Sequence, residues 1–141
     1  MMLIWPWALT EVGVGYETQL IVQRFESLPR DQLWVAAVFG VVLLPLFEEV
    51  LFRVFLQPLL VQNFSEKGGV LLTSLAFAAL HGTSAFLPIF GLSLLLGGVM
   101  LRTQRLTAVW LVHALHNGIT TAALFSEAGK EVGKGTGGML F

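Results

Sequence analysis

Seven polar or ionisable side chains lie inside stretches that are otherwise apolar enough to cross a bilayer, and this feature constrains the fold most strongly. They are Glu48, Glu49, Arg53, His81, His113, His116 and Asn117. Placing a charged side chain in hydrocarbon costs several kcal/mol unless the charge is paired or hydrated. A chain that does this repeatedly, at helical spacings, is expected to gather these groups into a polar site within the membrane.

The composition agrees with a membrane setting and excludes other classes of protein. The mean hydropathy is +0.78 and 12% of the residues are charged, below ordinary soluble usage. The net charge of -1 and the lack of a basic stripe argue against a nucleic-acid partner. The sequence has no cysteine, which excludes disulfides, thiolate metal ligands and a cysteine nucleophile.

The apolar pattern divides the chain into three parts. Residues 1–32 form an arm that fits an amphipathic helix on the membrane surface or, equally, a plain solvated arm. Residues 33–125 form the core, and residues 126–141 form a Gly- and Lys-rich tail that is expected to be flexible. Four apolar segments make up the core: 33–61, 70–81, 86–101 and 106–125. The predicted fold class is all-α, a multi-pass integral membrane bundle with about four membrane helices around a polar intramembrane cavity.

The first apolar segment is longer than a bilayer requires. As a helix it would measure roughly 40 Å, against a hydrocarbon core of ~30 Å. It is therefore expected to tilt or bend, and Pro45 predicts a kink next to the carboxylates.

Glu48, Glu49 and Arg53 form the first polar group. Glu49 and Arg53 are four residues apart, the spacing of an intrahelical ion pair. Glu48 lies about 100° further round the helix and is free to act as a general base. A purely structural salt bridge would account for Glu49 and Arg53 but would leave Glu48 without a partner.

The second group consists of His81 with His113, His116 and Asn117. His81 stands at the end of an apolar segment, where a histidine is also common as a helix-end cap. His113, His116 and Asn117 share a broad helical face, and hydrogen bonding between membrane helices would explain them. Together with a carboxylate, however, they supply a base, an orienting group and oxyanion donors. Four side chains are therefore expected to converge on one cavity: Glu48, His81, His113 and Asn117.

The same side chains could hold a metal ion. Glu48, His81 and His113 offer one carboxylate and two imidazoles, a ligand set that suits zinc. The HExxH helix of the common zinc proteases is absent from the sequence. No cofactor is expected, because a water-activating carboxylate with an oxyanion pair needs no ion; zinc is the alternative.

Three short motifs occur in order on successive apolar segments. They are Glu48-Glu49-x-x-x-Arg53, Phe77-x-x-x-His81 and His113-x-x-x-Asn117. Over about residues 33–122 the chain resembles the CPBP intramembrane proteases, the CAAX-protease and bacteriocin-processing family that is also called the Abi family.

The resemblance implies an endopeptidase that cuts a membrane-associated peptide or protein substrate within the lipid bilayer. It implies that Glu48 is the general base that activates water, that His81 holds and polarises this water, and that His113 and Asn117 stabilise the oxyanion. Three further residues would orient or support the site: Glu49, Arg53 and His116. Prenylated CAAX termini, leader peptides of bacteriocin-like products and membrane-anchored regulators all fit as substrates.

A membrane protein without catalytic activity is the competing class. An immunity protein, a scaffold for a larger protease and a small channel or transporter subunit belong to it. Full biological activity of the Glu48→Gln variant would favour this class.

Overall fold

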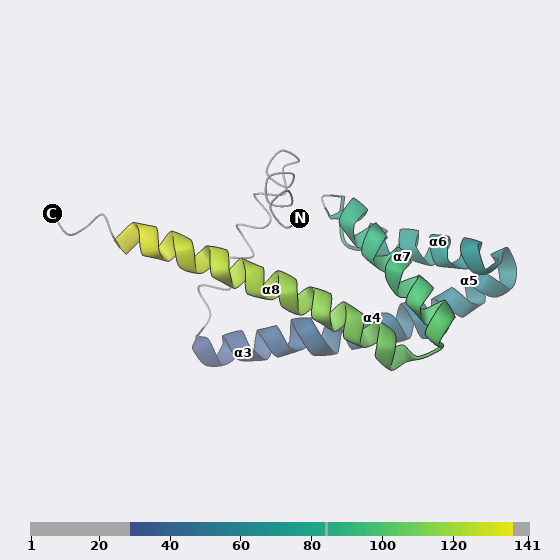
Figure 1. Ribbon diagram of the computed structural model, residues 1–141, viewed down its shortest axis with the longest axis horizontal. Coiled ribbons are helices and arrows are strands. Elements are labelled where there is room, and N and C mark those ends of the chain that lie inside the picture. Colours follow the sequence, from purple (N-terminus) through teal and green to yellow (C-terminus); the bar gives the residue numbers. More distant parts are fainter. Residues whose placement is uncertain (1–28, 84, 137–141) are drawn as a thin grey trace. The chain divides into compact units, whose positions relative to one another are not determined.

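The computed structural model describes residues 29–83 and 85–136. Every regular element in these residues is helical, which confirms the all-α fold class. Within these described residues, four helical stretches follow one another: residues 30–64, Glu66–Ala79, Phe86–Thr103 and Leu106–Thr136 (Figure 1).

The first stretch alternates between α-helical and π-helical turns. Its segments are α3 (Arg30–Val38), a π-helical turn (Phe39–Leu43), α4 (Leu44–Glu49), a second π-helical turn (Val50–Leu56) and α5 (Gln57–Phe64). A proline follows shortly after each π-helical segment: Pro45 after the first and Pro58 after the second. Proline lacks an N–H and its ring crowds the carbonyl four residues earlier, so a wider turn at that place relieves the clash. The irregularity expected at Pro45 takes this form.

Two residues other than glycine in the described part of the chain have positive φ, and each lies between two helices. Ser65 has a φ of 95°, and its Oγ accepts from the Gly68 N–H at 3.3 Å, which caps the start of α6 (Glu66–Ala79). Gln104, with a φ of 52°, ends α7 (Phe86–Thr103) in the left-handed conformation. The last helix is α8 (Leu106–Thr136).

These bounds correct the expected segments. The first and second helical stretches extend beyond the expected segments 33–61 and 70–81, because α5 continues to Phe64 and α6 begins at Glu66. The polar side chains there lie on helix ends, where they remain exposed. His81 lies in the turn after α6, where its backbone N–H donates to the Ala78 carbonyl at 3.1 Å.

The two ends of the chain are described only in part. α8 continues to Thr136, so the start of the segment that was expected to be a flexible tail is helical. The expected surface helix within residues 1–32 lies, up to residue 28, outside the described residues.

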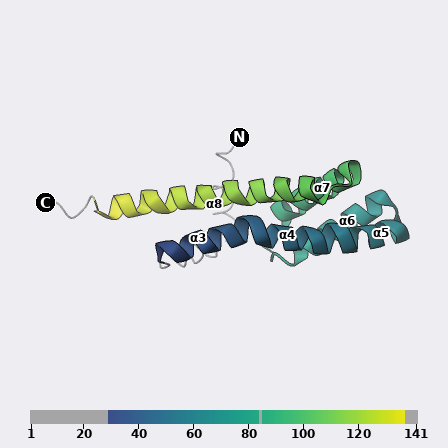
Figure 2. The ribbon, with the colours of Figure 1, turned by 90° about the horizontal axis from the view of Figure 1, so that it is seen from below.

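Contacts divide the described residues into two units, residues 42–115 and residues 29–41 with 116–136. In the first unit, α6 packs against both α5 and α7 (Figures 1 and 2). Gly97 permits this close approach, since a Cβ there would lie 2.9 Å from Val70 Cγ1 and 3.1 Å from Gln57 Oε1. The buried apolar side chains of this unit are Phe52, Val70, Phe77, Ala78, Leu96 and Val109.

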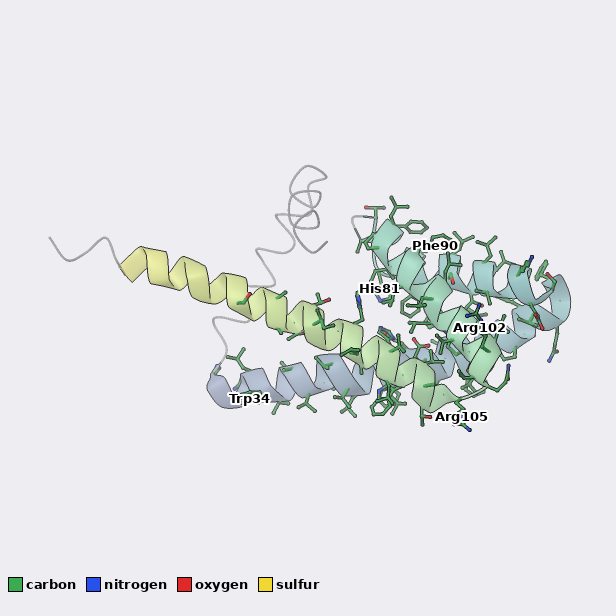
Figure 3. The ribbon with its side chains drawn as sticks, viewed as in Figure 1. Trp34, His81, Phe90, Arg102 and Arg105 are labelled. Atoms are coloured by element: carbon green, nitrogen blue, oxygen red, sulfur yellow. The ribbon has the colours of Figure 1, made fainter. Side chains whose placement is uncertain are left out.

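In the part of the chain that the structure describes, two helices are long and apolar enough to cross a membrane, judged by length and composition: Gln32–Phe64 and Phe86–Thr103. Large apolar side chains stand exposed along the first, including Trp34 at 74% (Figure 3) and Phe55 at 66%. An apolar surface of this extent is typical of contact with lipid or with a protein partner. The 14 residues of α6 reach about 21 Å, less than the ~30 Å hydrocarbon core.

Candidate active site

The carboxylate of Glu49 is fully buried and is held at both oxygens. Arg53 Nε donates to Glu49 Oε2 at 2.9 Å, which confirms the ion pair expected from the four-residue spacing. His113 Nδ1 lies 2.7 Å from Glu49 Oε1. The side chains of Glu49 and Arg53 are both 0% exposed. Because both oxygens are engaged, Glu49 can hold its neighbours in place but is poorly placed to act on a substrate.

Glu48 faces a different set of groups and is partly open. Its side chain is 20% exposed; Oε1 lies 3.7 Å from His81 Nε2, and Oε2 lies 3.6 Å from His113 Nε2. These separations exceed the length of a direct hydrogen bond. The two imidazoles therefore flank the Glu48 carboxylate without locking it.

The hydrogen-bond partners of the two Nδ1 atoms define the tautomers of His81 and His113. His81 Nδ1 lies 2.7 Å from the Phe77 carbonyl oxygen, which can only accept, so Nδ1 carries the proton. His113 Nδ1 likewise donates to Glu49, whose carboxylate also accepts from Arg53. In the neutral form of both rings, each Nε2 is then an acceptor. Glu48 and the two Nε2 atoms thus present acceptors toward one another, an arrangement that suits a water molecule or a cation.

The ring of Phe77 packs against the imidazoles of both histidines. Its ring is fully buried, with its centroid 4.6 Å from that of His81 and 5.8 Å from that of His113. Arg53 Cζ lies 5.5 Å from the same centroid, within cation–π range. Figure 3 labels His81, just beyond the end of α6. Phe77 therefore fixes the imidazole planes and covers the ion pair from one side.

Among the buried polar residues that sequence reasoning missed are Ser93 and Gln57, whose side chains bond between helices. Arg53 Nη2 donates to Ser93 Oγ at 2.9 Å, and Gln57 Nε2 donates to the Gly97 carbonyl at 3.2 Å. Gln57 follows Arg53 by four residues. The periodicity that pairs Glu49 with Arg53 could therefore have extended the polar face by one turn to Gln57.

Asn117 and His116 belong to the other unit. An amide N–H of Asn117 donates to the Gly40 carbonyl at 3.1 Å, and the His116 carbonyl accepts from Thr120 Oγ1 at 3.0 Å. Their proposed functional roles stay predictions. Within residues 42–115 the structure brings together the remaining candidates: Glu48, Glu49, Arg53, His81 and His113.

No group of three or more His, Cys, Asp or Glu side chains in the described part of the chain is arranged to hold a metal ion. The zinc alternative depends instead on the donor chemistry of Glu48, His81 and His113, whose facing atoms are all potential ligands. It stays a prediction.

Comparison with known proteins gives one match. The sequence matches the family described as Type II CAAX prenyl endopeptidase Rce1-like over residues 30–119, which include Glu48, His81, His113 and Asn117. No curated protein and no solved structure matches the sequence. The matched region covers more than half of the 141 residues, and the chain belongs to the Type II CAAX prenyl endopeptidase Rce1-like family.

Proposed function

We propose that the chain is an intramembrane endopeptidase that hydrolyses a peptide bond of a membrane-associated substrate with water activated by Glu48. The family to which it belongs consists of peptidases. The observation that carries the assignment to Glu48 is the contrast with its neighbour. Glu49 is buried with both oxygens engaged, whereas Glu48 is partly exposed and faces two imidazole Nε2 atoms at 3.6 and 3.7 Å.

In the proposed reaction, Glu48 acts as the base and carries one proton from the attacking water to the leaving nitrogen. Glu48 takes a proton from water as the water oxygen attacks the peptide carbonyl carbon, and the carbonyl π electrons move to oxygen. Glu48 then passes the proton to the peptide nitrogen as the oxyanion electron pair re-forms the carbonyl and the C–N bond breaks, which releases a carboxyl and an amine product. His81 Nε2 accepts from the second water proton and orients the lone pair of the attacking oxygen. A positioned general base typically contributes about 10²–10⁴-fold to the rate.

We propose that His113 and Asn117 stabilise the oxyanion. His113 Nε2 can donate only when the ring is an imidazolium, because Nδ1 already carries the proton that is shared with Glu49. The Glu49 carboxylate would balance that charge. The Asn117 amide has two N–H groups, one of which donates to Gly40, so one remains for an oxyanion.

We propose further that about four helices lie in the membrane around a polar cavity. The large apolar side chains exposed along Gln32–Phe64 support contact with lipid, while Glu48, Glu49 and Arg53 on the same helix turn toward other polar groups. Water must reach the scissile bond, and the partial exposure of Glu48 supports such access.

The proposal is tested with the purified protein in liposomes and three substrates: a prenylated CAAX peptide, the same peptide without the prenyl group, and a leader peptide. We expect the wild type to cleave at least one of them. In the Glu48→Gln variant we expect kcat to fall by about 10²–10⁴-fold or more, with helical content by circular dichroism unchanged. Retention of kcat by Glu48→Gln on a substrate that the wild type cleaves would refute the role of Glu48.

The alternative without catalysis predicts a different pattern. Wild-type protein would cleave none of the three peptides, and Glu48→Gln would retain full biological activity. Cleavage by the wild type together with its loss in Glu48→Gln excludes this alternative.

The metal question needs a separate measurement. We propose a metal-free reaction, since water activation by Glu48 needs no ion. The acceptor atoms of Glu48, His81 and His113 nevertheless form a ligand set that suits zinc, which requires three protein ligands at about 2.0–2.2 Å and an open position. We expect purified protein to lack stoichiometric zinc by mass spectrometry and its activity to resist chelators. Loss of activity with a chelator, restored by zinc alone, would overturn the metal-free reaction.

A further inference from the structure

In the unit formed by residues 42–115, hydrogen bonds between buried polar groups join two helices on two successive turns. Arg53 and Gln57 are one turn apart on the helix that contains Val50–Leu56 and α5, and Ser93 and Gly97 are one turn apart on α7. Arg53 Nη2 donates to Ser93 Oγ at 2.9 Å, and Gln57 Nε2 donates to the Gly97 carbonyl at 3.2 Å. All four residues are buried.

Hydrogen bonds continue from Arg53 to His113, whose second ring nitrogen faces the candidate catalytic carboxylate of Glu48 without bonding to it directly. Arg53 Nε holds Glu49 Oε2 at 2.9 Å, Glu49 Oε1 lies 2.7 Å from His113 Nδ1, and His113 Nε2 lies 3.6 Å from Glu48 Oε2. A carboxylate is a rigid planar group, so fixing one oxygen also fixes the direction of the other. The position of His113 therefore depends on the position of Arg53.

We propose that Ser93 is a positioning residue: its hydroxyl holds Arg53, which through Glu49 fixes the orientation and tautomer of His113 beside Glu48. For its catalytic consequence the inference rests on the proposed peptidase function. Arg53 Nη1 has no hydrogen-bond partner among the described residues. Ser93 Oγ is thus the acceptor that anchors the distal end of the guanidinium.

Loss of the Ser93 hydroxyl would leave both terminal nitrogens of a buried guanidinium without an acceptor. An unsatisfied buried donor is costly, and more so when it is charged. The guanidinium would rotate toward another acceptor and loosen its bond to Glu49 Oε2. Glu49 would then turn, and His113 Nδ1 would lose its fixed acceptor.

The kinetic test compares Ser93→Ala with Ser93→Thr. We expect Ser93→Ala to lower kcat by about 10- to 100-fold, as for other residues that orient a catalytic group, with KM within about twofold of wild type because the hydroxyl does not contact substrate. Ser93→Thr keeps the hydroxyl and should restore most of kcat. If Ser93→Ala does not fold, Ser93→Cys, of similar size and a weaker acceptor, provides the same comparison.

A spectroscopic test reads the positioning directly. The sequence has three histidines, so ¹⁵N-histidine labelling gives few signals, which single His→Gln variants assign. We expect the neutral ring of wild-type His113 to carry its proton on Nδ1 and the neutral ring in Ser93→Ala to be a mixture of the two tautomers. Ser93→Thr should resemble the wild type.

Ser74→Ala is the matched control. Ser74 is a fully buried serine of the neighbouring helix α6, and its Oγ has no hydrogen-bond partner among the described residues. The substitution removes the same atom from a similar environment without breaking a contact to Arg53. We expect kcat and the His113 signals of Ser74→Ala to match the wild type.

The outcomes separate the inference from the proposed function. Wild-type kcat and unchanged His113 signals in Ser93→Ala would overturn the inference while leaving the peptidase assignment intact. Equal kcat losses in Ser93→Ala and Ser74→Ala, with unchanged His113 signals, would overturn it as well, because the effect would then be one of packing. A wild type that cleaves no peptide would refute the proposed function, and a tautomer change in Ser93→Ala alone would still support the positioning of His113.

Discussion

Two adjacent glutamates divide the candidate site into a closed half and an open half. In the closed half, Glu49 is held by direct contacts of 2.9 Å to Arg53 and 2.7 Å to His113, and its side chain is fully buried. In the open half, Glu48 lies 3.6–3.7 Å from His81 and His113 and is partly exposed. Neighbours in sequence therefore have opposite environments.

The difference shows how two consecutive residues of one helix can have different roles, one structural and one proposed to be catalytic. Successive side chains point about 100° apart, so one residue can face the protein interior while the next faces the partly exposed candidate site. His113 belongs to both halves, since Nδ1 contacts Glu49 and Nε2 faces Glu48. The closed half can thus control the open half through a single imidazole.

Replacing each glutamate by glutamine is the strongest test of whether the two carboxylates have different roles. Glu49→Gln leaves the buried Arg53 without a counter-charge, and we expect a loss of about 3–5 kcal/mol in the free energy of unfolding. Glu48→Gln, the matched control, should change this free energy by less than about 1 kcal/mol while abolishing cleavage. Unfolding in mixed micelles with increasing SDS measures both. Equal losses of stability in the two variants would show that the halves are not distinct.

Asn117→Ala tests the proposed oxyanion role of Asn117, a residue of the other unit. If Asn117 donates to the oxyanion, kcat should fall by about 10²–10³-fold. Trp110→Phe is a suitable control, because Trp110 Nε1 donates to the Val42 carbonyl at 2.9 Å, as Asn117 Nδ2 donates to that of Gly40. A kcat for Asn117→Ala no lower than that of Trp110→Phe would assign Asn117 a structural hydrogen bond only.

Gly97→Ala probes how tightly the closed half is packed. A Cβ at residue 97 would lie 2.9 Å from Val70 Cγ1 and 3.1 Å from Gln57 Oε1, so we expect a loss of about 1–3 kcal/mol from overpacking. At Gly98 a Cβ would meet nothing within 4 Å, and Gly98→Ala should be neutral or slightly stabilising. The comparison uses the same unfolding measurement. A neutral Gly97→Ala would mean that α7 can move away from α5 and α6 without cost.

The sequence alone determined the helical class and the residues that share a helix face. Glu49 and Arg53 could be paired in advance because the contact lies within one helix and depends only on a four-residue spacing. Local turn chemistry was harder to anticipate. Ser65 alone separates α5 from α6, although a longer polar stretch surrounds it.

Tertiary structure decided which helix faces meet. Nothing in the local pattern indicates that Arg53 reaches Ser93, forty residues later, or that His113 bonds to Glu49 and only faces Glu48. Periodicity fixes the direction of a side chain relative to its own helix axis, whereas the register and rotation of packed helices follow from the fit of side chains such as Val70 against Gly97. Local spacing therefore identified the polar groups, and the contact of His113 from α8 with Glu49 determined which carboxylate was closed and which stayed open.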